Sequence, residues 1–305
     1  MSAVTVPLTW STALTSWQPN TTAAACALIG AAGYAWCYRR ARPSLTTAHA
    51  SCYAVAVALF VVATLSVVNV YSPVLFWMRA VQVLLLLMVI PFFLAMSRPV
   101  TALRAALSPA RQDRLDAILA GRAPRLLLHP ATTSVAMLAL PWLFYLTPWY
   151  RAALRYPSVM EAAGALMLTV GFGYYYARLQ TDPVPRRYTQ LLSLVITIVE
   201  SLGDGVLGIV LWLGPLIAAH YYRGLGRQWG PSMRVDQSIG AGVLWLVGDV
   251  LGVFFVLVLM RYFAADEKRH ARIVDTELDT GVADVPQSGL WWENDPQLRY
   301  RMGRG

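Results

Sequence analysis

Long apolar runs separated by short polar segments make up most of this chain. A helix crosses about 30 Å of hydrocarbon with about 20 mostly apolar residues, and seven runs come close to that length or exceed it. They cover residues 21–38, 47–70, 74–97, 131–148, 158–178, 189–219 and 238–262. The pattern therefore predicts an all-α integral membrane protein, a bundle of seven transmembrane helices.

The segments outside the runs predict three regions. Residues 1–20 are expected to be an extracytoplasmic N-terminal segment, and residues 21–263 the membrane bundle. Residues 264–305 are expected to be a cytoplasmic and partly disordered tail, because they are first charged and then rich in Gly, Pro and Asp. Within the polar segment after the third run, Ser108-Pro109 is typical of a helix start. A short helix at the membrane interface is expected there.

Composition agrees with a lipid environment. Apolar residues make up 57% of the chain and charged residues 13%, whereas an average soluble domain has about 25% charged residues. The net charge of +9 would suit a nucleic-acid partner, but the basic residues are arginines beside apolar runs, with Lys268 as the lysine. This placement favours membrane lipid as the partner and argues against nucleic acid.

The distribution of arginine predicts the orientation. One set of loops carries most of the basic residues, and the positive-inside rule places that set in the cytoplasm. The N-terminus is then outside and the C-terminus inside a plasma membrane that the chain crosses several times. The cytoplasmic set includes Arg39, Arg40, Arg42, Arg98, Arg104, Arg111, Arg114, Arg122, Arg125, Arg178, Arg186 and Arg187. The opposite set is Arg79, Arg151, Arg155, Arg223, Arg227 and Arg234.

Polar residues inside the predicted spans are the candidates for function. Charge at membrane depth costs at least about 2.5–3.5 kcal/mol on insertion scales, so such residues face the bundle and have partners. In one interpretation Arg79 forms a structural ion pair with Glu161 or another acid. In the other, a polar cavity handles a cation or proton, and Asp204 and Asp249 share a proton if they face each other. The predicted set is Arg79, Gln82, Glu161, Glu200, Asp204 and Asp249.

Metal and catalytic motifs are sparse. The histidines at 49, 129, 220 and 270 are scattered, and Cys26, Cys37 and Cys52 are interpreted as small buried apolar residues. Thioether sulfur suits Cu(I), which makes Met78, Met160 and Met167 weak candidate ligands, although scattered methionines usually serve packing. The chain has no Gly-rich phosphate loop, nucleophile elbow or H-E-x-x-H motif. It is therefore not expected to be an enzyme.

Several stretches resemble the CtaG family of membrane proteins. The stretch from Val70 to Phe76, followed by Gln82 and Arg98-Pro99-Val100, is similar to the third-span region of that family. Four later stretches occur in the family order: Phe144 to Tyr150, Thr181-Asp182-Pro183, Trp229 to Ser232 with Asp236-Gln237, and Gly240 to Trp245 before Gly248-Asp249. The resemblance covers about residues 15–275. It implies a factor that helps to assemble caa-type cytochrome c oxidases, with oxidase subunits as partners and copper delivery on the outer side.

Histidines expected from this resemblance are missing. The family's third span typically reads H-M-x-x-H, and the corresponding positions here are Arg79, Ala80 and Val83. Imidazole positions near Glu161 hold Met160, Gly164 and Leu166, while Asp204 and Asp249 stand at a His and a Glu position. A permanent guanidinium charge opposes Cu(I) binding. The hypothesis is a CtaG-like assembly factor whose metal site is degenerate, with its cofactor unknown.

The alternative is a transporter or channel for small solutes or ions that uses Glu200, Asp204 and Asp249. Gly203, Gly205 and Gly208 would then mark a helix break at mid-membrane. The same small residues also favour close helix packing, which is expected at Gly205/Gly208 and at Gly240/Gly242.

Overall fold

A computed structural model describes residues 6–41, 45–180, 182, 203, 205–254, 257, 260 and 261. The chain divides into two compact units, Met1–Leu257 and Val258–Gly305, and the elements below belong to the first. All the regular elements that these residues form are helices, which confirms the all-α class.

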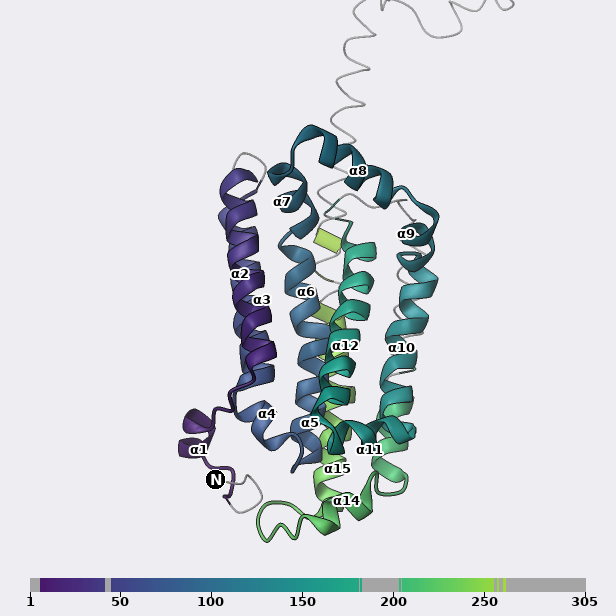
Figure 1. The fold of residues 1–305 in the computed structure, drawn as a ribbon. Coiled ribbons are helices and arrows are strands. Elements are labelled where there is room, and N and C mark those ends of the chain that lie inside the picture. The colour runs from purple at the N-terminus through teal and green to yellow at the C-terminus, as the bar shows by residue number, and fades with distance from the viewer. Residues whose placement is uncertain are drawn as a thin grey trace, which may run out of the picture. The chain divides into compact units, whose positions relative to one another are not determined.

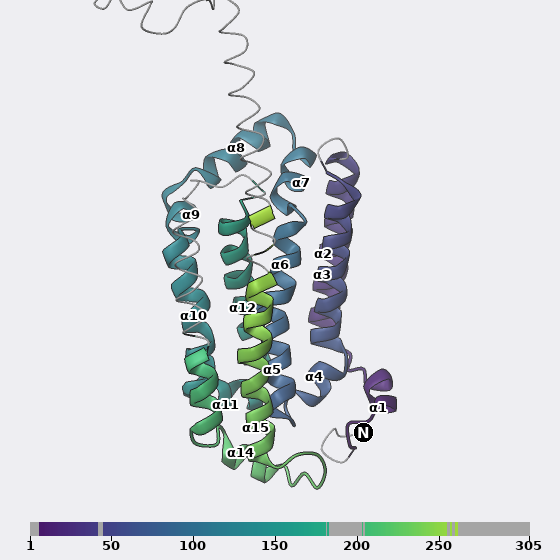
Figure 2. The same ribbon diagram turned by 180° about the vertical axis from the view of Figure 1, so that it is seen from behind.

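The predicted spans within the described part of the chain correspond to helices that run side by side (Figures 1 and 2). Some spans consist of consecutive helical segments. The elements are α2 (Thr21–Ala41), α3 (Thr47–Leu65) with α4 (Val67–Tyr71), α5 (Phe76–Leu84) with the π-helix η1 (Leu85–Val89) and α6 (Ile90–Met96), α10 (Pro130–Leu146), α12 (Pro157–Leu179), and α15 (Met233–Gly242) with the π-helix η2 (Val243–Val247).

Three of the described helices are long and apolar enough to cross a membrane: Thr47–Tyr71, Phe76–Met96 and Met233–Phe254. Pro130–Leu146 is apolar but shorter. These helices support a membrane protein but not the count of seven spans. Most of the predicted span 189–219 lies outside the described residues, and its described helix ends at Leu213 instead of continuing to 219. Gly214 and Pro215 follow, and proline has no N–H to continue the helical hydrogen bonds.

Short helices lie at both ends of the bundle (Figure 1). One end, called the α8 end, has α7 (Pro99–Ala106), α8 (Pro109–Leu119) and α9 (Arg122–Leu127). The other, called the α14 end, has α1 (Trp10–Thr15), α11 (Pro148–Arg155) and α14 (Ala219–Gly224). The predicted start at Ser108-Pro109 is confirmed, since Ser108 is the N-cap of α8. The sequence did not predict α7, which packs on α2 and buries Ala102 completely.

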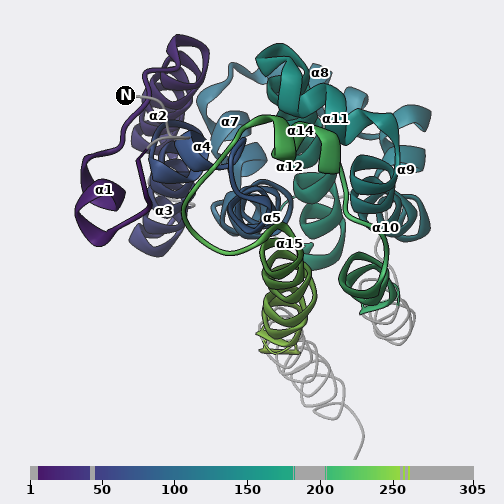
Figure 3. The ribbon, with the colours of Figure 1, turned by 90° about the horizontal axis from the view of Figure 1, so that it is seen from below.

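The segment α5–η1–α6 is the centre of the bundle. It contacts α3, α4, α12 and α15, and Figure 3 shows α5 among these helices. Of the most apolar stretch within Phe76–Met96, 61% is buried inside the protein. The corresponding share is 22% in Thr47–Tyr71 and 22% in Met233–Phe254. Side chains on this segment are therefore positioned by neighbours on several sides.

A π turn in the central segment allows close packing of α12. Pro91 has no N–H, so it cannot donate the hydrogen bond that the Leu87 carbonyl would receive in an α-helix. Just before it, the Ile90 N–H donates to the Leu85 carbonyl, five residues back, which is the pattern of a π-helix. Gly171 of α12 lies against this turn. A Cβ at Gly171 would overlap the Leu87 carbonyl oxygen and lie 2.8 Å from Cγ of Pro91.

Three of the four glycine contacts that the sequence predicts are confirmed, whereas the contact at Gly171 was not predicted. A Cβ at Gly205 or Gly208 would meet Trp245, and one at Gly240 would meet Phe76. Gly242 differs, because a Cβ there would have no neighbour within 4 Å among the described residues. The prediction of a close contact at Gly242 was wrong.

Replacing Gly171 with alanine should destabilise the bundle. The new methyl group would collide with backbone and a proline ring, neither of which moves easily, so the free energy of unfolding should fall by about 1–3 kcal/mol. Thermal unfolding of the purified protein in detergent would measure the change. Gly173→Ala is the matched control on the same helix, since its Cβ would make an ordinary 3.8 Å contact with Leu128. Equal stability of the two variants would contradict the packing argument.

Candidate functional site

Arg79 and Gln82 form a buried polar pair on the central helix. Each side chain is 2% exposed, and Nη1 of Arg79 donates to Oε1 of Gln82 at 2.6 Å. The Gln82 amide then donates to the Ala63 carbonyl at 2.8 Å and to Oδ1 of Asn69 at 3.2 Å. The pair therefore connects α5 to α3 and α4.

Glu161 lies near the start of α12 and has a different partner. Its Oε1 accepts a hydrogen bond from Nδ2 of Asn20 at 2.9 Å, and Oδ1 of Asn20 accepts from the Ala23 N–H in the first turn of α2. Both Arg79 and Glu161 are described residues, and no ion pair joins them. The Arg79 partner in the structure is the Gln82 amide, so the expected ion pair with Glu161 was wrong.

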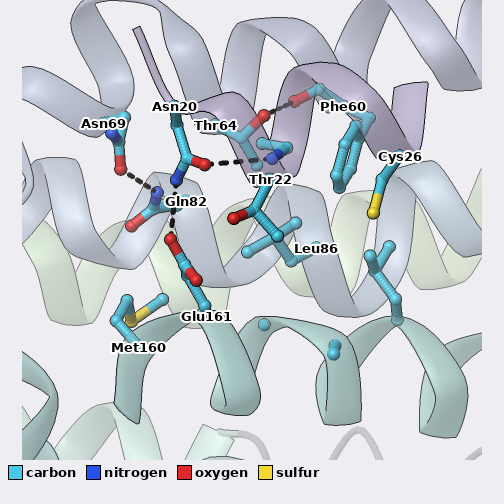
Figure 4. Close-up of a pocket in the computed structure, with 14 residues that line it drawn as sticks. Asn20, Thr22, Cys26, Phe60, Thr64, Asn69, Gln82, Leu86, Met160 and Glu161 are labelled. Carbon is cyan, nitrogen blue, oxygen red and sulfur yellow. Dashed lines mark hydrogen bonds between the residues drawn. The ribbon is translucent and has the colours of Figure 1, made fainter. Parts of the chain in front are cut away.

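Two cavities meet at this polar group. The inner cavity, of about 250 Å³, is lined at one end by Asn20, Asn69, Gln82 and Glu161 and further in by apolar residues that include Phe60, Leu86 and Leu168. Figure 4 shows the side chains of Asn20, Gln82 and Glu161 converging there. The second cavity, called the mouth, has a volume of about 400 Å³ and is lined by Arg79, Arg155 and Pro73. Both are lined by Asn20, Thr22, Asn69, Met160 and Glu161.

Only part of the predicted polar set comes together here. Arg79, Gln82 and Glu161 line these cavities. Asp249 lines neither of them. Glu200 and Asp204 lie outside the described residues.

The candidate copper ligands are also separated. Met160 lines both cavities, whereas Met78 belongs to a core cluster with Val68, Tyr71 and Leu75, and Met167 is completely buried. Cys26 was predicted to be buried but is exposed, and it lines the inner cavity.

The donor set does not fit copper. Cu(I) prefers several soft ligands, but the described cavity walls combine one thioether and one thiol with amide and carboxylate oxygens and two guanidinium groups. Across the described part of the chain, no three His, Cys, Asp or Glu residues lie close enough to hold a metal ion. His129 lines neither cavity and accepts a hydrogen bond from the Ala131 N–H at the start of α10.

Asp236, in the first turn of α15, holds the start of the central helix. It is 2% exposed, and its carboxylate accepts the N–H groups of Phe76 at 3.1 Å and Trp77 at 3.0 Å. These are the first residues of α5, whose N–H groups have no partner within the helix. Arg227 forms an ion pair with Asp236 at 3.4 Å. Arg79 follows one turn along α5, so Asp236 helps to position it.

The next residue, Gln237, supports a third helix end. Pro215 cannot donate to the Leu211 carbonyl, and the Gln237 amide donates to that carbonyl at 2.6 Å. The same amide donates to the Pro215 carbonyl at 3.0 Å, and its oxygen accepts the Ile217 N–H at 2.7 Å. The side chain of Gln237 therefore replaces the helical hydrogen bonds lost at Pro215.

Asp182 plays the corresponding part at the α8 end. Its carboxylate accepts the N–H groups of Val100 at 3.1 Å and Thr101 at 3.0 Å, at the start of α7, and also the Thr101 hydroxyl. Asp182 follows α12 in the chain, so this contact fastens that end of α12 to α7.

Comparison with known proteins gives a family and distant relatives. The family model of the cytochrome c oxidase caa3 assembly factors (Caa3_CtaG) matches residues 32–266. Uncharacterized proteins of Mycobacterium bovis and Mycobacterium tuberculosis are each 28% identical over 291 residues, which cover 91% of this chain and 44% of each relative. An uncharacterized protein of Mycobacterium leprae is 27% identical over 225 residues, 71% of this chain and 34% of the relative. The chain thus spans less than half the length of these relatives. No solved structure matches it.

Removing the Asp236 carboxylate should destabilise the α14 end. In Asp236→Ala the N–H groups of Phe76 and Trp77 lose their acceptor and Arg227 loses its counter-ion, so the free energy of unfolding should fall by about 3 kcal/mol. Thermal unfolding in detergent would measure the loss. The control is Asp113→Ala on α8, where the replaced carboxylate is exposed. A loss no larger than in this control would show that the buried contacts contribute little.

Proposed function

The chain belongs to the family of cytochrome c oxidase caa3 assembly factors, and from this premise we propose that it supports assembly and copper maturation of cytochrome c oxidase with a degenerate metal site. The observation that carries the proposal is the match over residues 32–266. The family indicates a non-catalytic role, in association with the oxidase. Oxidase subunits are the proposed partners within the membrane.

The degenerate metal site is inferred from the cavity walls. At the position of the first imidazole in the family's third span, this chain has Arg79, which gives a hydrogen bond to Gln82. The cavities beside this pair supply mainly oxygen ligands and two guanidinium cations. We propose that the protein acts through contacts with the oxidase or its other assembly factors and does not hold the copper itself.

The proposed topology is a multi-pass bundle with seven spans. At about 1.5 Å per residue, α2 with 21 residues and α12 with 23 would reach across the hydrocarbon core. Arginines are frequent in α7, α8 and α9, and the positive-inside rule then favours a cytoplasmic α8 end. The α14 end, with the two cavities, would face outward, on the side of the N-terminus.

The polar residues are proposed to act structurally. Arg79 and Gln82 tie the central helix to α3 and α4, while Glu161 ties α12 to the start of α2 through Asn20. Glu200, Asp204 and Asp249 remain predicted members of the intramembrane polar set.

The purified protein is expected to bind Cu(I) weakly. A chromophoric Cu(I) chelator in anaerobic competition should remove all the metal, because one thioether and one thiol are too few soft ligands for tight binding. Wild type and Met160→Leu should give the same titration. Retention of one equivalent of Cu(I) that is lost in Met160→Leu would contradict the degenerate site.

Loss of the gene should lower oxidase function. We expect reduced cytochrome c oxidase activity per unit of oxidase subunit in membranes of a deletion strain, and recovery when the gene is restored. The Gly173→Ala variant serves as a complementation control, since its added methyl group is expected to fit.

Adding copper to the deletion strain distinguishes a role in copper supply from a role in another assembly step. Recovery of the deletion strain with copper alone would place the protein in copper supply to the oxidase. A defect that copper leaves unchanged would place it in another assembly step. Normal oxidase in the deletion strain under both conditions would refute the assembly role.

A further inference from the structure

The two cavities at the α14 end differ in the polarity of their walls. The inner cavity is apolar away from its polar end, whereas the mouth is lined by Arg79, Arg155, Asn20 and Glu161. The shared residues show that the two cavities adjoin each other. A ligand that occupied both would need a polar head and an apolar chain.

The inner cavity opens on the side of the bundle. It lies between α2 and α12, and these helices pack on different neighbours: α2 on α3 and α7, and α12 on α6, η1, α10 and α11. Two of its wall residues, Cys26 of α2 and Ala165 of α12, are exposed. An apolar chain could therefore enter from the lipid side without unfolding the bundle.

Arg79 indicates the charge of the head. Its side chain is 2% exposed, and Nε has no hydrogen-bond partner among the described residues. Its partner at Nη1 is a neutral amide, and no carboxylate of the described chain lies within ion-pair distance of it. A buried guanidinium without a counter-ion is costly. A phosphate would supply both the negative charge and hydrogen-bond acceptors in the geometry that arginine prefers.

Arg155 adds a second cation at the same place. It is exposed and lines the mouth, where it could contact a head group that remains partly in water. Glu161 is the acid of the described mouth wall, and Asn20 donates a hydrogen bond to it. Two cations against one carboxylate leave a net positive mouth.

We propose that the mouth and the inner cavity together bind one anionic phospholipid, with its phosphate at Arg79 and Arg155 and an acyl chain between α2 and α12. The inference needs the protein to be in a membrane but does not depend on the assembly role. It assigns the cavity walls to lipid binding, a role that is separate from copper binding and from contact with an oxidase subunit.

Native mass spectrometry of the purified full chain in detergent tests the proposal. The protein would be titrated with phosphatidylglycerol, with phosphatidylethanolamine and with inorganic phosphate. One phosphatidylglycerol should bind in preference to phosphatidylethanolamine, because its head group has a net negative charge and that of phosphatidylethanolamine has none. Equal binding of the two lipids would overturn the proposal, as would inorganic phosphate that binds and displaces the lipid at similar concentration.

Two variants address the head and the chain separately. Arg79→Gln should weaken phosphatidylglycerol binding about tenfold or more, because a charge-assisted hydrogen bond is lost. Ala165→Trp should weaken it similarly by filling the inner cavity from an exposed position, and it keeps the test decisive if Arg79→Gln does not fold. Arg223→Gln is the control, an exposed arginine of α14 that lines neither cavity. Unchanged binding in Ala165→Trp, or an equal loss in the Arg223→Gln control, would refute the site.

A thiol at the cavity gives an independent readout in the wild type. Cys26 is exposed and lines the inner cavity, whereas Cys52 is half-buried on α3 and does not line it. Phosphatidylglycerol should slow the alkylation of Cys26 by a maleimide and leave the rate at Cys52 unchanged. Unchanged labelling of Cys26 at saturating lipid would contradict the placement of the chain.

Discussion

The α14 end of the bundle depends on the hydrogen bonds of the first turn of α15. Helix ends expose backbone groups without intrahelical partners, and in a low-dielectric environment each unsatisfied group is costly. Asp236 accepts the first N–H groups of α5, and Gln237 donates to the carbonyl that Pro215 leaves free. Two adjacent side chains of α15 thus supply hydrogen-bond partners to backbone groups at the ends of two other helices. These bonds fix the start of α5 relative to α15, and the positions of Arg79 and Gln82 along α5 follow from it.

This arrangement gives a physical meaning to two sequence stretches that resemble the family. In sequence, Asp182 and Asp236 are acids beside predicted spans, and such acids suggest ligands or proton carriers. In the structure each accepts two consecutive N–H groups of another helix, at opposite ends of the bundle. A carboxylate used in this way contributes charge complementarity to a helix N-terminus and has few lone pairs left for a metal. These positions are therefore explained by folding, and the search for function moves to the cavity walls.

The hydrophobic pattern predicted the long helices of the described chain better than it predicted their partners. Apolar runs indicated those helices, and Ser108-Pro109 indicated the start of α8, because hydrophobic period and proline chemistry are local. Neither signal predicted α7. The ion pair of Arg79 with Glu161 was inferred from similar depth, but depth does not fix the facing side of a helix. Asn20 and Asn69, which complete the polar group, lie in short connecting or helical segments where an amide is common. Their role depends on α2, α4 and α12 meeting, which no local pattern encodes.

The charge of Arg79 determines the kind of ligand that the α14 end can favour. An imidazole is neutral when it ligates a metal, so a His-based site accepts a cation without electrostatic opposition. A guanidinium keeps its charge under all ordinary conditions, and here it lies 2% exposed with a neutral amide as its hydrogen-bond partner. A permanent positive charge at this position opposes a cation in the adjoining cavity and attracts an anion. The helix ends do not depend on this charge, because the bonds that hold them come from Asp236, Gln237 and Asp182 and do not involve Arg79. A scaffold held together by backbone capping can therefore change the residues of its cavity walls and keep its fold.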